Sequence, residues 1–162
     1  IHPLNVCYNL VSFHADGASL CAGLLHDVVE DTDYTLEYIE QEFGKDVAFL
    51  VDGVTKISNL HYSSKDEATN ANIRRLINSL NDDVRIIIIK LCDRLHNIRT
   101  LDFKAPEKRI RSAEETLNIF VPLAYFIGAF RLKCELEDLC LQYLDSESYE
   151  ALKIQYEKIA KD

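Results

Sequence analysis

An imidazole and three carboxylates are crowded into six positions, His26-Asp27-Val28-Val29-Glu30-Asp31. His26 and Glu30 are four residues apart, as are Asp27 and Asp31, so on a helix each pair would share a face. The cluster follows an apolar segment, which places it at the negative end of the expected helix dipole. Such crowding is unfavourable unless a cation binds there. Read alone, however, these six residues are equally consistent with a solvated acidic helix end.

A second set of polar residues lies in a strongly hydrophobic segment that is expected to form a helix. Asp93, Asn97 and Thr100 are spaced as one stripe of a helix, and Leu91, Leu95 and Ile98 form the opposing apolar stripe. The helix should therefore be buried, and a buried carboxylate needs a partner or a metal. Two interpretations remain open for Asp93, namely metal ligation and a salt bridge to a nearby arginine.

The remaining histidines carry less information. His2 precedes Pro3, which suits the first turn of a helix. We interpret His14 and His61 as surface-loop residues, and His96 as a helix residue with a hydrogen bond of its own.

Together, His2, the pair His26-Asp27 and Asp93 resemble the H…HD…D arrangement of HD phosphohydrolases. Two imidazoles and two carboxylates suit Mn²⁺ and leave positions open for water and a phosphate oxygen. Three stretches resemble the hydrolase domain of the RelA/SpoT family, and the resemblance covers essentially the whole chain: HDVVEDTDYTLEYIEQEFGKDVAFLVDGVTKISNL, IIIIKLCDRLHNIRTL and LKCELEDLCLQYL.

The resemblance implies Mn²⁺-dependent hydrolysis of ppGpp and pppGpp to GDP or GTP and pyrophosphate. It implies that the metal ligands are His2, His26, Asp27 and Asp93. It also implies that Glu30 and Asp31 are the catalytic pair that orients and deprotonates the attacking water, and that Asn97 and Thr100 contact the nucleotide. One alternative is an HD phosphohydrolase for another nucleotide. Another is a non-catalytic alarmone-binding module that regulates an attached synthetase, against which the intact Glu30 and Asp31 argue.

Two features depart from the family pattern. The basic segment that precedes the first histidine in the family is absent, and Tyr125-Phe126 stands where members commonly have His-Arg. The chain starts at Ile1 and contains no Met, so we expect a fragment of a longer, bifunctional enzyme with possible synthetase and regulatory domains.

The composition sets the broad class. The chain has 162 residues, 48% hydrophobic and 28% charged, with a net charge of −9. An acidic chain is a poor nucleic-acid binder, and no apolar run is long enough to span a membrane. The odd set of five cysteines, without a C-x-x-C pair, favours buried reduced thiols in a cytoplasmic protein.

The periodicity predicts an all-α fold, an HD-domain helical bundle with central buried helices that carry the metal ligands. We expect helices over 4–13, 20–29, 35–44, 45–57, 64–80, 83–101, 107–126, 130–144 and 149–161. The run Ile86 to Ile89 has strand propensity, but its uninterrupted surroundings favour a helix. We expect one domain over 1–162, with about 130–162 as a possible bridge toward a synthetase domain.

Overall fold

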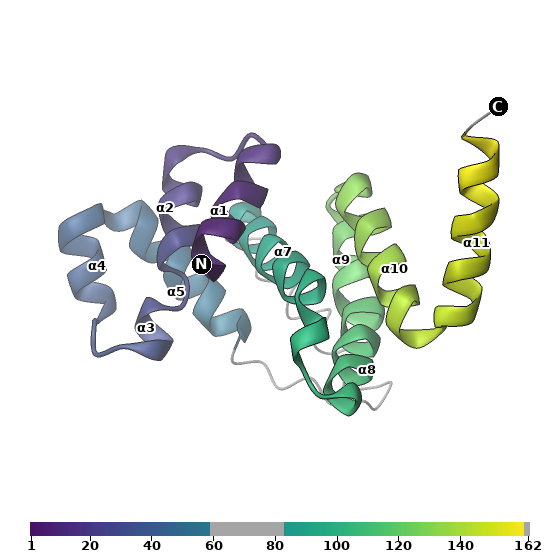
Figure 1. The fold of residues 1–162 in the computed structure, drawn as a ribbon. Coiled ribbons are helices and arrows are strands. Elements are labelled where there is room, and N and C mark those ends of the chain that lie inside the picture. The colour runs from purple at the N-terminus through teal and green to yellow at the C-terminus, as the bar shows by residue number, and fades with distance from the viewer. Residues whose placement is uncertain (59–82, 161–162) are drawn as a thin grey trace. The chain divides into compact units, whose positions relative to one another are not determined.

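The computed structural model describes residues 1–58 and 83–160, and these are helical or lie in turns and loops, without a strand among them (Figure 1). The predicted all-α class is therefore confirmed. The chain divides into two compact units, Ile1–His96 and Asn97–Asp162. The expectation of one domain over the whole chain, with a bridge at its end, stays a prediction. The helix expected over 64–80 lies outside the described residues.

The first unit contains five complete helices and most of a sixth among its described residues. These are α1 (His2–Ser12), α2 (Gly17–Leu25), α3 (Val28–Asp31), α4 (Leu36–Phe43), α5 (Lys45–Ser58) and α7 (Val84–Arg99). Helix α2 packs against both α1 and α5, and α4 packs against α5 (Figure 1). Local signals set several ends, because Pro3 lies in the first turn of α1 and the Asp16 side chain accepts the Ser19 amide at 2.8 Å.

Helix α7 settles the segment whose sequence was ambiguous. Ile86 to Ile89 lie inside it. Ile87 and Leu91 are completely buried, and Leu95 is almost completely buried. The prediction of a buried helix is confirmed. Burial on this stripe explains why β-branched residues are tolerated here, since tertiary packing outweighs their weak preference against the helix.

The helix expected over residues 20–29 ends earlier than predicted, at Leu25. Asp27 has φ −94° and ψ −6°, outside ideal helix geometry, and the short α3 begins directly after it. His26 and Asp27 therefore form a turn between α2 and α3, and the spacing argument for a single helix face was only partly right.

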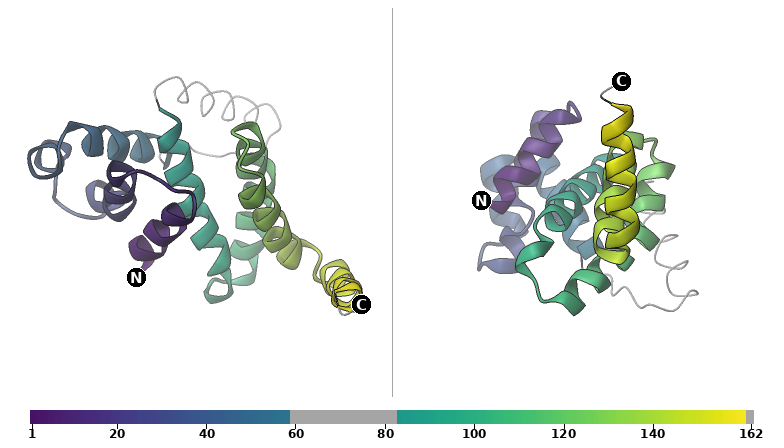
Figure 2. Two further views of the ribbon diagram at one scale, coloured as in Figure 1. Left: turned by 90° about the horizontal axis from the view of Figure 1, so that it is seen from above. Right: turned by 45° about the vertical axis from the view of Figure 1, so that its right-hand side comes forward.

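The second unit is also helical, and it begins with the last residues of α7. Its described elements are a 3₁₀ turn (Leu101–Phe103), α8 (Pro106–Glu115), a π-helical segment (Thr116–Phe120), α9 (Val121–Phe126), α10 (Phe130–Leu144) and α11 (Ser146–Ile159). Pro122 has no N–H to donate, and the wide π turn ends two residues before it. Phe120, Leu123 and Leu136 are buried in this unit. Figure 2 shows α11 following the end of α10, and residues 150–159 of α11 are exposed.

Two expectations about surface and solvent can be judged here. None of the helices over the described residues has the length and apolarity to cross a membrane. All five cysteines are free thiols. Cys92 and Cys140 are buried as predicted, whereas Cys134 is exposed, because it lies on the outer side of α10, away from Leu136 and Cys140.

Candidate metal centre

Three side chains from separate segments of the first unit converge on one point. His2 comes from α1, His26 follows the last residue of α2, and Asp93 lies in α7. The Nε2 atoms of His2 and His26 are 3.3 Å apart, and Asp93 Oδ1 lies 3.1 Å from His2 Nε2 and 3.8 Å from His26 Nε2. One donor atom from each residue lies within 4.8 Å of the others, among the described residues.

This triangle fits a small divalent cation. With ligand distances of about 2.2 Å, two donors lie about 3.1 Å apart at a right angle and about 3.6 Å apart at a tetrahedral angle. The three observed edges of 3.1, 3.3 and 3.8 Å span that range. Mixed imidazole and carboxylate donors suit borderline first-row cations.

Asp27 stands at the edge of the triangle. Its Oδ1 lies 3.0 Å from His26 Nε2 and its Oδ2 lies 3.8 Å from His2 Nε2. It does not belong to the group whose donor atoms all lie within 4.8 Å of one another. The hydrogen bond with His26, followed by the charge of that residue, lowers the pKa of Asp27. Asp27 therefore adjoins the three converging residues as an ionised carboxylate.

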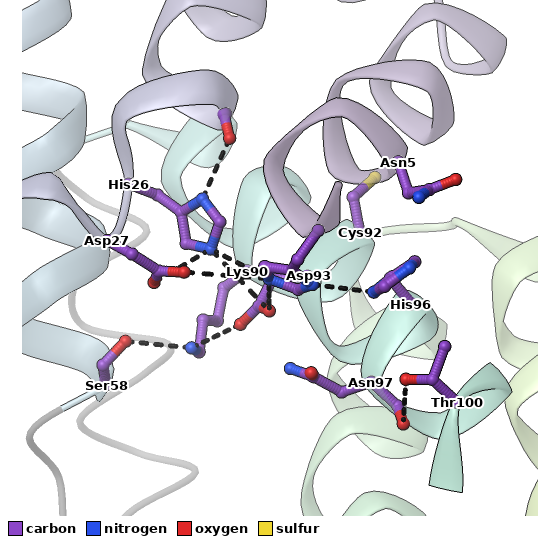
Figure 3. A network of polar contacts seen from close by, with 12 residues as sticks. Asn5, His26, Asp27, Ser58, Lys90, Cys92, Asp93, His96, Asn97 and Thr100 are labelled. Atoms are coloured by element: carbon purple, nitrogen blue, oxygen red, sulfur yellow. Dashed lines mark hydrogen bonds and ion pairs between the residues drawn. The ribbon is translucent and has the colours of Figure 1, made fainter. Parts of the chain in front are cut away.

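His26 is held by its backbone and by its surroundings. It is 1% exposed, and its Nδ1 lies 2.9 Å from the Gly23 carbonyl oxygen, an acceptor, so Nδ1 carries the proton. That bond directs Nε2 toward Asp27 and Asp93 (Figure 3). Burial by itself would lower the pKa of His26, but the two carboxylates outweigh it and the pKa is raised. The site attracts positive charge.

Asp93 is paired with a lysine that sequence reasoning missed. Lys90 Nζ donates to Asp93 Oδ2 at 2.6 Å and to Ser58 Oγ at 2.9 Å (Figure 3). Burial would raise the pKa of Asp93, but the His2 hydrogen bond and the Lys90 charge hold it well below its usual range. The expected salt-bridge partner was an arginine. The i, i+3 spacing of Lys90 and Asp93 on α7 was the available signal.

A second residue that sequence reasoning undervalued is His96. Its Nδ1 lies 2.7 Å from His2 Nδ1, and the two rings are tilted by 59° with centroids 4.7 Å apart. His96 does have a hydrogen bond, as expected, but its partner is the first candidate ligand. His14, in contrast, lies in the turn between α1 and α2 with φ 55°, away from this cluster in the chain, and His61 lies outside the described residues.

The acidic pair Glu30 and Asp31 lies on α3, the short helix that begins directly after Asp27. Both backbone amides donate to the Asp27 carbonyl oxygen, at 3.1 and 2.8 Å respectively. Both side chains are exposed. The short turn therefore ties the pair to Asp27 and leaves both carboxylates open to solvent.

The predicted nucleotide contacts, Asn97 and Thr100, lie at the start of the second unit. Asn97 is one helical turn after Asp93 on α7, and Thr100 Oγ1 donates to the Asn97 carbonyl oxygen at 3.3 Å (Figure 3). Both residues are partly exposed. Their role in nucleotide binding stays a prediction.

Comparison with known proteins adds independent information. A family model described as HD domain matches residues 1–130. A Synechocystis protein named "Probable guanosine-3′,5′-bis(diphosphate) 3′-pyrophosphohydrolase" is 49% identical over 152 residues, which cover 94% of this chain and 20% of the relative. The Escherichia coli "Bifunctional (p)ppGpp synthase/hydrolase SpoT" is 45% identical over 152 residues, covering 94% of this chain and 22% of the relative.

A solved structure agrees with the sequence matches. It is described as a metazoan ortholog of SpoT that hydrolyzes ppGpp, and it matches with a TM-score of 0.62 and 29% identity, over 87% of this chain and 79% of that one. The resemblance to RelA/SpoT hydrolase domains that the motifs indicated is confirmed. The chain spans about a fifth of the length of the curated relatives it matches.

Proposed function

Since the chain belongs to the HD-domain family, we propose that it removes the 3′-pyrophosphate from (p)ppGpp in a reaction that depends on Mn²⁺. The observation that carries the proposal is the convergence of His2, His26 and Asp93 from three segments, with Asp27 against both histidines. The names of the relatives supply the substrate class.

We infer that His2, His26, Asp27 and Asp93 hold the cation. When bound, a divalent cation polarises a phosphate oxygen and makes water more acidic. Neighbouring groups of the chain hold two of these ligands in position. Gly23 fixes the ring of His26, and Lys90 holds the second oxygen of Asp93.

Glu30 and Asp31 are proposed to orient the attacking water and to take its proton. Attack at the proximal phosphorus would form a new P–O bond and break the bond to the ribose 3′-oxygen. Pyrophosphate then leaves intact, and the 3′-oxygen receives a proton, which yields GDP or GTP. Exposure of both carboxylates, one turn from Asp27, supports this role because substrate and water can reach them. Asn97 and Thr100 are proposed to contact the nucleotide.

The test separates metal binding from catalysis. Glu30→Gln and Asp31→Asn should keep bound Mn²⁺ and the fold, while pyrophosphate release falls by about 10² to 10⁴, the usual worth of general-base assistance. His26→Ala should lose metal and activity together. Glu42→Gln, an exposed acid on α4, is the matched control and should change neither.

The measurement is metal content beside product analysis with ppGpp, pppGpp and a panel of other nucleotides. Near-normal turnover in both acidic variants would remove them from the mechanism. Hydrolysis of another nucleotide but not ppGpp would favour the alternative HD phosphohydrolase. Binding without turnover would favour a regulatory module. Comparison of Mn²⁺ with Mg²⁺, Zn²⁺ and Co²⁺ tests the choice of metal.

The setting of the domain is also a proposal. We propose a cytoplasmic location, which suits the five free thiols and the nucleotide substrate. A synthetase and regulatory domains are expected in the longer protein, as the lengths of the relatives suggest. Product analysis of the longer protein with GTP, GDP and ATP tests for the synthetase.

A further inference from the structure

The contact between His2 and His96 is a hydrogen bond of a restrictive kind. The two Nδ1 atoms are 2.7 Å apart, within hydrogen-bond range for nitrogen atoms. A neutral imidazole has one N–H donor and one acceptor nitrogen. For two neutral rings, one Nδ1 must therefore carry the proton and the other must accept it, so the tautomers of His2 and His96 are linked.

The other nitrogen of His2 decides which way the bond runs. His2 Nε2 is the atom that faces His26 Nε2 and Asp93 Oδ1, at 3.3 and 3.1 Å. A metal ligand must offer a lone pair, so Nε2 has to be unprotonated when the cation is bound. The proton of His2 then lies on Nδ1, and Nδ1 donates to His96.

We propose that His96 is a positioning residue for the metal centre: it accepts the Nδ1 proton of His2 and so holds the Nε2 lone pair of His2 toward His26 and Asp93. This inference rests on the metal site of the proposed function. It concerns His96 alone, which belongs to neither the metal-ligand set nor the catalytic pair assigned above.

The need for such a partner follows from the exposure of His2. Its side chain is 28% exposed, whereas His26 is 1% exposed and held by the Gly23 carbonyl oxygen. His96, half-buried on α7, supplies from another helix the restraint that Gly23 supplies to His26. Partners of this kind fix both tautomer and ring orientation.

The experiment reads the hydrogen bond and the metal affinity separately. In wild-type protein loaded with diamagnetic Zn²⁺, ¹⁵N NMR of the histidine rings should show the proton of the shared hydrogen bond on His2 Nδ1 and none on His96 Nδ1. A proton on His96 Nδ1 instead would overturn the proposal without any variant. His96→Phe removes the acceptor, and its affinity for Mn²⁺, measured by calorimetry, should fall by about 10- to 100-fold.

Two further variants separate positioning from packing. His96→Asn can place an oxygen acceptor near the position of Nδ1 and should recover most of the Mn²⁺ affinity. His14→Asn, which alters a histidine in the turn after α1, should leave Mn²⁺ affinity unchanged, since asparagine tolerates the positive φ of that position. Unchanged Mn²⁺ affinity in His96→Phe would refute the positioning role.

No nucleotide enters these measurements, so the inference and the proposed function can fail separately. If metal affinity depends on His96 but the wild-type protein does not hydrolyse ppGpp, the proposed function is refuted and the positioning role is supported. A protein that hydrolyses ppGpp, and whose His96→Phe variant binds Mn²⁺ normally, would do the reverse.

Discussion

Replacement of Lys90 by methionine should destabilise the metal-free protein far more than the metal-bound protein. Lys90 Nζ lies 2.6 Å from Asp93 Oδ2, and the two side chains are 13% and 6% exposed. At an effective dielectric of about 20, their attraction is about 6 kcal/mol before desolvation is subtracted. Removal of one partner from a buried pair costs about 3 to 5 kcal/mol, because the other charge stays behind unpaired.

We expect the lower end of that range, about 3 kcal/mol, because His2 also contacts Asp93. A bound cation would replace the lost positive charge and reduce the loss to about 1 kcal/mol. The difference of about 2 kcal/mol must then appear in metal binding, so Lys90→Met should bind Mn²⁺ about 30-fold more tightly than wild type.

Urea unfolding in EDTA and in saturating Mn²⁺ measures the two stabilities, and calorimetry measures the affinity. Lys56→Met is the matched control, because Lys56 forms a Lys–Asp pair with Asp52 on α5 but is 72% exposed. It should cost at most about 1 kcal/mol, equally with and without metal. An equal loss for Lys90→Met in both conditions, or a weaker affinity for Mn²⁺, would refute the reasoning.

Two predictions concern the frame around the site. A Cβ added at Gly53 would lie 2.4 Å from Ile86 Cδ1 and 2.9 Å from its Cγ1, so Gly53→Ala should cost about 1 to 3 kcal/mol in urea unfolding. Gly17→Ala meets no atom within 4 Å, and an equal loss there would exclude overpacking as the cause. The hydrogen bond from Arg85 lowers the pKa of Asp83 in the folded protein. This interaction therefore stabilises the fold at pH values above the pKa of an unfolded aspartate, near 4, and the stabilisation is lost as the pH falls below that value. Arg85→Met should therefore cost about 1 kcal/mol at pH 7 and little near pH 2, and a loss that is constant with pH would contradict this.

Much of the fold was accessible from local patterns. Helical spacing over a nineteen-residue segment identified α7 despite its isoleucine run, because a buried helix must repeat its apolar residues every three to four positions. Capping at Asp16 and Thr35 is likewise local, since the side chain bonds to an amide three residues away. The end of α2 at Leu25 could not be predicted from the sequence, because no glycine or proline follows it directly and its C-cap residue His26 still has α-helical backbone angles.

At the candidate site, the sequence predicted the candidate residues, but it did not predict which residues contact them in space. The resemblance to HD phosphohydrolases identified His2, His26, Asp27 and Asp93 as candidate ligands, since each cluster read by itself left other roles open. Only the tertiary structure decided that three of them form a tight triangle while Asp27 lies at its edge. It also decided that His96 meets His2 across 94 residues of chain. Such contacts depend on how helices pack, and neither ring-to-ring tautomer coupling nor donor-to-donor distance leaves a periodic signal in the sequence.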